Sequence, residues 1–160
     1  MRRFILLIAC AFTLVAPKAG GQIPVVKDAR VISFEENKVP DNWKGAGLAI
    51  NTAHYKDGKQ SMQWTFKPGE TISLKKDVMF QKKDPTGKDL YLSTFTGWFY
   101  NTKAINDSIR VGFYKEGKEC CHFNLRTAFT GWRAAWVCFE RDMQGTPQEG
   151  MDEVRFTAPK

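Results

Sequence analysis

The segment from Trp132 to Phe139 has apolar side chains on both of its faces, and this property limits the folds that the chain can adopt. In an extended segment, alternate side chains point to the same face. Trp132 and Trp136 then share one face, whereas Val137 and Phe139 share the other. A strand that is apolar on both faces lies in the middle of a sheet or between two layers. Two interpretations of the tryptophans stay open: at least one of them fills the core, or one of them is a platform that stacks on a sugar ring.

Short segments with a two-residue alternation make up much of the remaining chain. Residues 61–66, 109–114 and 120–125 alternate along their length in the way that half-buried strands do. We expect a first strand at Val31–Phe34 and a last strand at Asp152–Thr157, with glycine, proline, aspartate and asparagine turns between the segments. No segment has a convincing helical period. The predicted fold class is therefore all-β, and an antiparallel β-sandwich or jelly roll closes such a set of strands around one core.

The amino terminus has the features of a signal peptide. Basic residues in Met1–Arg3 precede the apolar run Phe4–Ala16, which has about the length of a signal-peptide core and is too short to span a bilayer. Small residues at 19–21 suit cleavage before Gln22. The alternative is a lipoprotein signal, because Leu7–Cys10 resembles a lipobox that would anchor the protein at its cysteine, Cys10. Both interpretations predict export.

Export defines the domain organisation and the charge that we expect. Residues 1–21 are the predicted signal peptide, and residues 22–160 form one domain in the periplasm or the extracellular space, with no membrane span. The full chain has 24 basic and 17 acidic residues, and the signal peptide holds three basic residues and no acidic one, which leaves a net charge of +4. A mildly basic protein suits a polyanionic partner, but no basic block resembles a nucleic-acid motif.

Three cysteines remain after removal of the signal peptide: Cys120, Cys121 and Cys138. Neighbouring residues of a strand point to opposite faces, so at most one of the first two readily reaches Cys138. A disulfide is one alternative in an exported protein. Buried free thiols that act as small apolar residues are the other. No spacing of cysteines and histidines predicts a zinc site.

No catalytic residue is predicted from this sequence. The chain has two histidines, His54 and His122, and neither belongs to a nucleophile or metal signature. A glycine-rich phosphate loop is also missing from the sequence. Carboxylates are plentiful, but no two of them have the spacing of a hydrolase pair. These observations argue against an autonomous active site.

A calcium site is one of two binding sites that the sequence suggests. Glu35 or Glu36 ends the first predicted strand, and Asp152 begins the last one. The first and last strands of a sandwich are commonly neighbours, so these carboxylates are candidates to meet at one end of a sheet. An inward-pointing carboxylate needs a partner, and hard oxygen ligands suit Ca²⁺. The alternative is that they are ordinary acidic residues at a sheet edge.

A carbohydrate site is the second suggestion. Trp98 and Tyr100 lie on the parity opposite the expected core side of their strand, and Arg110, Arg126 and Arg133 are the basic residues that we expect near them. Flat aromatic rings stack on sugar rings, and the guanidinium group binds sulfate and carboxylate. The alternative is that the second sheet covers these aromatic side chains.

A series of motifs runs along the chain after the predicted signal peptide: Phe34-Glu35 with Pro40 and Trp43, then His54–Trp64, Phe95–Asn101, Phe129–Arg133 and Met151–Pro159. The more specific of them are the Phe-Thr-Gly-Trp-Arg corner and the Arg-Phe-Thr-Ala-Pro end. In these motifs the chain resembles the N-terminal domain of the chondroitin sulfate ABC lyases, which are secreted or periplasmic enzymes that degrade glycosaminoglycans. The resemblance covers nearly all of the chain after the signal peptide, in order.

This resemblance implies a galactose-binding-like jelly roll, with a structural cation where Glu35 and Asp152 would meet. It implies that catalysis belongs to a following α-helical toroid and an antiparallel β domain, so no catalytic residue is assigned to this chain. The partner that it implies is a sulfated glycosaminoglycan such as chondroitin or dermatan sulfate, or the catalytic domain of the lyase itself. We expect either a fragment of a longer lyase or a gene reduced to the accessory domain.

Overall fold

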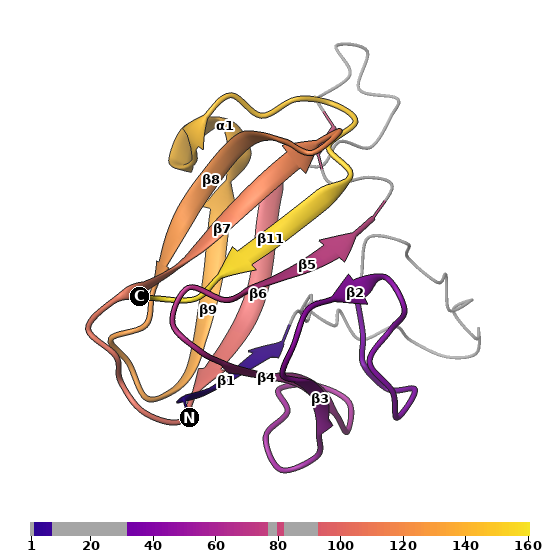
Figure 1. Cartoon of the computed structure of the whole chain (residues 1–160), viewed down its shortest axis with the longest axis vertical. Helices are drawn as coiled ribbons and strands as arrows, with labels where there is room; N and C mark the ends of the chain where they lie inside the picture. The colour runs from indigo at the N-terminus through magenta and orange to yellow at the C-terminus, as the bar shows by residue number, and fades with distance from the viewer. Residues whose placement is uncertain (1, 8–31, 77–79, 82–92) are drawn as a thin grey trace, which may run out of the picture.

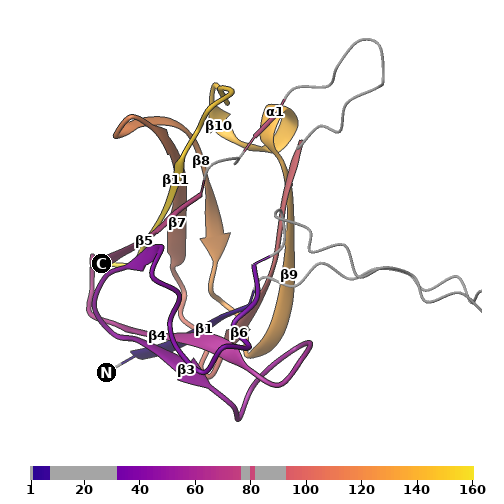
Figure 2. The same cartoon turned by 90° about the vertical axis from the view of Figure 1, so that its right-hand side faces the viewer.

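The computed structural model describes residues 2–7, 32–76, 80–81 and 93–160. Over these ranges the chain forms two antiparallel sheets that face each other (Figures 1 and 2). The elements are β1 (Arg2–Leu7), β2 (Trp43–Lys44), β3 (Leu48–Asn51), β4 (Ser61–Phe66), β5 (Thr71–Lys75), β6 (Thr94–Asn101), β7 (Ser108–Lys115), β8 (Lys118–Arg126), β9 (Gly131–Cys138), α1 (Phe139–Asp142), β10 (Gln144–Gly145) and β11 (Glu153–Thr157).

One sheet has five strands in the order β3-β4-β1-β6-β9, and the other has six in the order β10-β8-β7-β11-β5-β2. Every strand pair in both sheets is antiparallel. The prediction of a mostly β protein with antiparallel sheets is thus confirmed, with one short helix added. The jelly-roll connectivity and the galactose-binding-like classification stay predictions.

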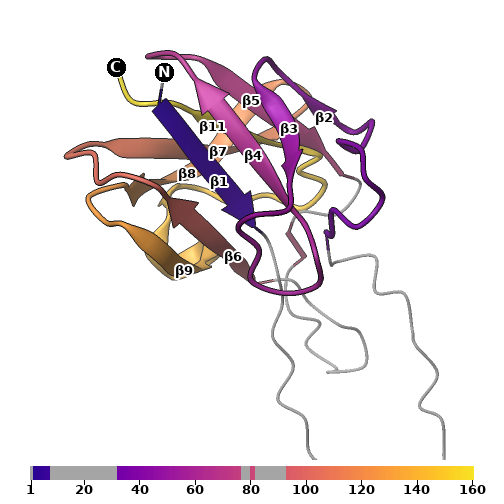
Figure 3. The same cartoon turned by 90° about the horizontal axis from the view of Figure 1, so that it is seen from below.

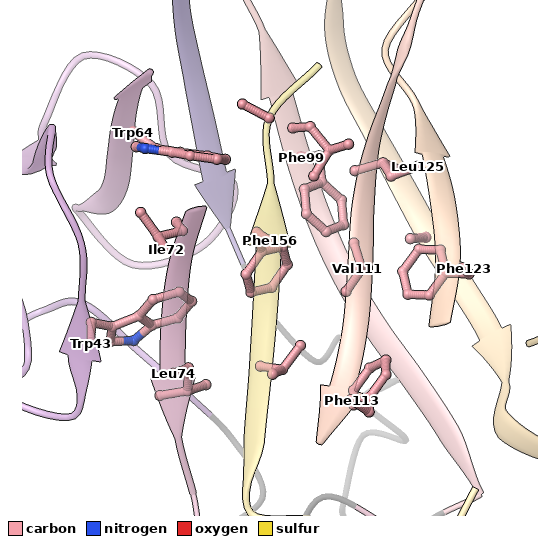
Figure 4. Close-up of a cluster of buried hydrophobic side chains, with 14 of the residues drawn as sticks. Trp43, Trp64, Ile72, Leu74, Phe99, Val111, Phe113, Phe123, Leu125 and Phe156 are labelled. Carbon is pink, nitrogen blue, oxygen red and sulfur yellow. The ribbon is translucent and has the colours of Figure 1, made fainter. Parts of the chain in front are cut away.

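Apolar side chains from both sheets fill the space between them (Figure 4). The alternation read from the sequence is confirmed in β4, β7 and β8, where every second side chain is buried. Rings supply much of this core: the rings of Trp43 and Phe156 stack at 5.9 Å, and Phe113 meets Phe139 edge-on at 4.8 Å. Large buried rings bury more apolar area per residue than aliphatic side chains, so they contribute much of the hydrophobic stabilisation of this core.

The segment 132–139 forms a strand, but not in the expected place. β9 is the last strand of its sheet, an edge rather than a centre. Its buried side chain is Ala135, whereas Trp136 is 72% exposed. Phe139 is buried, but it begins α1 instead of continuing the strand. The strand is therefore apolar on both faces because one face packs on the core and the outer face carries the tryptophans. The interpretation of these tryptophans as core filler is wrong for Trp136.

The first predicted strand, Val31–Phe34, is not a strand within its described part, Ile32–Phe34. Phe34 is buried, with its ring 6.0 Å from that of Trp43. The next residue, Glu35, is hydrogen-bonded through its side chain to the backbone of a distant turn. Ring packing and these hydrogen bonds hold the segment in place without strand pairing. The prediction that this segment is apolar and packs on the core is confirmed for Phe34, and the prediction that it is a strand is wrong for Ile32–Phe34.

A strand of the five-stranded sheet comes from the predicted signal peptide. β1 lies between β4 and β6 and pairs with both (Figure 3). Cleavage before Gln22 stays a prediction, and it would remove this strand. Among the described residues, no helix is long and apolar enough to cross a membrane.

Candidate functional site

Four aromatic side chains lie on the outer face of β6 and β9, which we call the aromatic face: Trp98, Tyr100, Trp132 and Trp136. The register places Tyr100 opposite Trp132, and the two rings lie 5.0 Å apart. Residues directly opposite each other in an antiparallel pair share a face of the sheet. Alternation along each strand then brings Trp98 and Trp136 to the same side. Trp136 is the most exposed of the four, and the other three are half-buried.

The loop between β3 and β4 lies over the part of the aromatic face that β6 forms. His54 stacks on Tyr100 with ring centroids 4.2 Å apart and planes within 17°. The ammonium group of Lys56 lies 4.4 Å from the centre of the Trp98 ring, within the range of a cation–π contact. Tyr55, between them in sequence, is 47% exposed. The loop therefore adds one cation and further ring surface to the face.

Hydrogen bonds hold both ends of this loop in place. At its start, the Asn51 side-chain oxygen accepts from the N–H groups of Ala53 at 2.9 Å and His54 at 2.8 Å. At its end, the Glu35 carboxylate accepts from the N–H groups of Lys59 and Gln60, each at 3.1 Å. The positions of the imidazole and ammonium groups over β6 are thus set before any ligand arrives.

Two of the three arginines predicted at the carbohydrate site lie on the other sheet. Arg110 and Arg126 belong to β7 and β8, on the parity opposite the buried residues, and so face outward from the six-stranded sheet. Arg110 is also engaged there: its guanidinium group donates to Glu119 at 2.6 Å. The structure therefore does not bring these two arginines to Trp98 and Tyr100.

Glu119 is the centre of a polar network on that outer face. Tyr114 donates its hydroxyl to Glu119 at 2.9 Å, and His122 Nδ1 lies 3.0 Å from the same carboxylate. Burial alone would raise the pKa of Glu119, but hydrogen bonds from Arg110 and Tyr114 outweigh it and hold the pKa below its usual value. The carboxylate stays ionised at neutral pH and neutralises Arg110, so this patch is a poor site for a sulfate group.

Arg133 lies near the start of the edge strand β9, opposite Phe99 in the register. Its guanidinium group lies 5.0 Å from the centre of the Phe129 ring. Trp132 and Trp136, one of which the sequence left open as a sugar-stacking platform, were not grouped with Trp98 and Tyr100, and Lys56 was not predicted at the site. The parity of the 132–138 segment could have joined the two tryptophans to that group. No signal in the sequence placed Lys56 over Trp98, because that contact depends on the fold of the β3–β4 loop.

The carboxylates of the predicted calcium site have different surroundings in the structure. β11 pairs with β5 and β7, so a strand ending at Glu35 is not its neighbour, and the expected meeting of first and last strands is wrong. Glu35 already accepts backbone hydrogen bonds, and Glu36 is exposed. One carboxylate oxygen of Asp152 is buried and finds no hydrogen-bond partner. The described residues contain no group of three His, Cys, Asp or Glu side chains that could hold a metal ion.

All three cysteines of the described chain are free thiols. Cys121 is buried, and its sulfur lies 3.7 Å from that of Met143. Burial raises the pKa of the Cys121 thiol to about 12, so this group stays neutral and unreactive at physiological pH. Of the two alternatives left open by the sequence, the structure has the free thiols.

Comparison with known proteins identifies relatives over most of the chain. A protein family described as "Lyase, N terminal" matches residues 28–160. A chondroitin sulfate ABC exolyase from Bacteroides thetaiotaomicron is 53% identical over 137 residues. A chondroitin sulfate ABC exolyase from Proteus vulgaris is 37% identical over 112 residues, and an endolyase from the same organism is 28% identical over 130 residues.

These matches cover much of this chain but little of each relative. The alignments span 84%, 70% and 64% of this chain, against 14%, 11% and 13% of the three lyases. The shared part is thus a small portion of much longer enzymes. Because the family match covers residues 28–160, the chain belongs to the family of lyase N-terminal domains.

Proposed function

We propose that this chain is the accessory domain of an exported chondroitin sulfate lyase and that it binds the sulfated glycan through its aromatic face. The observation that carries this proposal is Trp136, which is 72% exposed on the same outer face as three further aromatic rings. A single exposed apolar residue is ordinary, but neighbouring aromatic side chains on one face often mark a binding surface. The relatives are named as enzymes that act on chondroitin sulfate, which supplies the class of ligand.

The chemistry of the aromatic face suits an acidic sugar chain. The flat apolar side of a sugar ring packs on an indole ring such as that of Trp136, and the exposed hydroxyls stay in water. Lys56 adds a positive charge close to Trp98, where it can attract a sulfate or carboxylate group. The exported chain carries a net charge of +4, so its overall field also favours a polyanion.

Cleavage of the glycan is assigned to the rest of the parent enzyme. Elimination across the hexosamine–uronate bond needs a base for the C5 proton and a group that neutralises the uronate carboxylate. His54 is stacked on Tyr100, and His122 lies on β8 of the other sheet with its Nδ1 against Glu119 and Arg110, so neither histidine is free to act as such a base at the aromatic face. The purified chain is expected to give no unsaturated product from chondroitin sulfate.

The glycan proposal is tested by titrating the full chain, residues 1–160, with chondroitin sulfate oligosaccharides at two salt concentrations. We expect a Kd of roughly micromolar to millimolar, as for a single small contact surface. Trp136→Ala should weaken binding by about tenfold or more, because it removes the exposed ring without touching the core. Lys56→Ala should reduce the salt dependence, because it removes a charge contact with the polyanion.

Arg110→Ala is the matched control for this titration. Its guanidinium group is on the outer face of the other sheet and is paired with Glu119, so its loss should leave glycan affinity unchanged. Binding that disappears completely at the higher salt, or that falls equally for Arg110→Ala and Trp136→Ala, would mean that only general surface charge attracts the glycan. That outcome would contradict the aromatic face as a binding site.

A second candidate function is a structural one, in which the aromatic face packs against the catalytic part of the lyase. The same exposed ring supports it, because apolar patches also mark contacts between domains. The size of the relatives supports it too, since this chain corresponds to 14% of the Bacteroides enzyme. Trp136→Ala would then weaken affinity for a separately expressed catalytic part, with no glycan binding by the wild-type chain even at low salt.

Calcium binding near Asp152 is retained as a further proposal. The buried Asp152 oxygen without a partner suits a cation ligand, whereas the carboxylate of Glu35 is already bound by N–H groups. We expect Ca²⁺ to raise the melting temperature, since a ligand that binds only the folded state at one hundred times its Kd adds about 2.7 kcal/mol. Asp152→Asn should abolish this shift, and Glu36→Gln should keep it. An unchanged melting curve of the wild-type chain with Ca²⁺, Mg²⁺ or chelator would contradict the proposal.

A further inference from the structure

The position of β1 in the five-stranded sheet is a site for a β-strand, and we call it the β1 lane. It is bordered by β4 on one side and β6 on the other, and the resident strand is antiparallel to both (Figure 3). The strand that occupies it here, Arg2–Leu7, belongs to the predicted signal peptide. Export with cleavage before Gln22 would therefore take the resident strand away from the folded domain.

An empty lane would be costly. The sheet order β3-β4-β1-β6-β9 would separate into the pairs β3-β4 and β6-β9, each with a bare edge facing the gap. Backbone N–H and C=O groups along both edges would lose their partners next to the core. Two-stranded pairs of this kind are marginal on their own. The exported domain therefore needs another strand in this place.

The neighbours of the lane define the strand that fits. Lane positions opposite Trp64 and Met62 share the buried face of β4, so they require apolar residues; Phe4 and Leu6 occupy them in the resident strand. The position between these two lies opposite Gln63 and Tyr100, on the outer face. The fitting strand thus alternates, with its apolar side toward the core and its other side beside the aromatic face.

The carboxyl end of the chain reaches the entrance of this lane. Pro159 accepts a hydrogen bond from the N–H of Gly69 at 3.0 Å, in the turn that follows β4. Phe66, the last residue of β4, is opposite the first residue of β1. Figures 2 and 3 show the C-terminus on the same side of the molecule as the amino-terminal end of β1. A chain that continues past Lys160 could enter the lane there and run in the direction of β1.

We propose that the β1 lane accepts the strand that follows this domain in a longer lyase, in place of Arg2–Leu7, which cleavage before Gln22 would remove. The Bacteroides enzyme is about seven times as long as the matched region, since that region makes up 14% of it. Residues 22–30 are a poorer occupant, because Pro24 lacks the N–H that an interior strand must donate to both neighbours. The contact joins the accessory domain to the next part of the chain through main-chain pairing.

The test moves the strand from one end of the chain to the other. Residues 22–160 are produced alone, and also with a Gly-Ser linker of about six residues after Lys160 that spans up to roughly 20 Å, followed by a copy of Arg2–Leu7. The linked form should unfold cooperatively, with a melting temperature within a few degrees of that of the full chain. An Ile5→Pro change within the relocated copy should return the protein to the behaviour of residues 22–160 alone, which we expect to lack a cooperative transition.

Two further forms keep the test decisive. A third chain carries, after Lys160, the segment that follows the matched region in the Bacteroides thetaiotaomicron exolyase, and it should be rescued as well. If the linked form precipitates, a synthetic peptide of residues 1–8 added during refolding of residues 22–160 should restore the transition, whereas its Ile5→Pro twin should not. Failure of both routes while the full chain folds would overturn the lane as an acceptor.

Other outcomes would assign the lane to a different occupant and so overturn the proposal. Residues 22–160 that are monomeric and as stable as the linked form would mean that residues 22–30 fill the lane or that β4 and β6 close it. A stable dimer of residues 22–160 that dissociates when the relocated strand is added would point to exchange between two copies. Rescue by the relocated strand but not by the exolyase segment would exclude the following chain as the natural occupant.

Discussion

Gly47→Ala should destabilise the domain by about 2–5 kcal/mol. Gly47 has a positive φ of 76°, and a Cβ atom there would lie 2.0 Å from the carbonyl oxygen of Thr65. An alanine in the left-handed region costs about 1–2 kcal/mol, and forcing atoms into a packed site adds about 1–3 kcal/mol. The backbone around this position joins β3 to β4, through a hydrogen bond of 2.8 Å from Thr65 N–H to Gly47 C=O. Urea unfolding followed by circular dichroism measures the loss.

Gly69→Ala is the matched control for this change. Its φ is 74°, almost the same as that of Gly47, but a Cβ atom there would have no neighbour within 4 Å. Only the conformational cost of about 1–2 kcal/mol should then appear. The difference between the two variants measures the close approach of β3 to β4. Equal losses in both would show that β3 does not lie against Thr65 as described.

Features that depend on a few neighbouring residues could be predicted from the sequence. The alternation in β4, β7 and β8 is set by which side chains face the core, and the residues of each strand alone are enough to recognise it. Trp98 and Tyr100 were placed on the outward parity of their strand for the same reason, and the structure has them there. The antiparallel class followed from short strands joined by turns.

Features that depend on distant parts of the chain could not be predicted. Arg110 and Trp98 both face outward from their strands, but they belong to different sheets, and parity says nothing about which sheet a strand joins. The hydrogen bond from Lys59 in the β3–β4 loop to the Glu35 carboxylate joins residues 24 positions apart, so no local sequence pattern predicts it. The expected meeting of Glu35 and Asp152 depended on a distant pairing in the same way, because it assumed that the first and last predicted strands are neighbours. Calcium binding itself stays a prediction.

The strand Arg2–Leu7 lies within the predicted signal peptide, so the same apolar segment suits two roles. Phe4–Ala16 was assigned from its length and its position after basic residues, which are the features that the export machinery reads. Pairing of Arg2–Leu7 with β4 and β6 depends instead on main-chain groups and on an available lane. Cleavage before Gln22 would end both roles of this segment, because it removes Arg2–Leu7 while β4 and β6 stay in the domain.

Phe99→Ala should destabilise the domain by about 3–5 kcal/mol, because it leaves a cavity in the centre of the core. Phe99 has no exposed surface and lies among the core side chains (Figure 4). On β6 it is on the face opposite Trp98 and Tyr100. Neighbouring rings can relax into the space only in part, since side chains of both sheets surround it. Calorimetric or urea unfolding of the variant should show the loss directly. Glycan affinity, measured well below the transition, should stay close to that of the wild type, because the ring is on the core side of the sheet.

Trp136→Ala is the opposite case on the same sheet. The side chain is 72% exposed on the neighbouring strand, so its removal should change the free energy of unfolding by less than about 0.5 kcal/mol while glycan affinity falls. The pair of variants thus separates the two faces of the sheet: side chains on the core face stabilise the fold, and side chains on the outer face bind the glycan. A stability loss of several kcal/mol for Trp136→Ala would mean that this ring is covered in the folded protein, and it would contradict the aromatic face as an open surface.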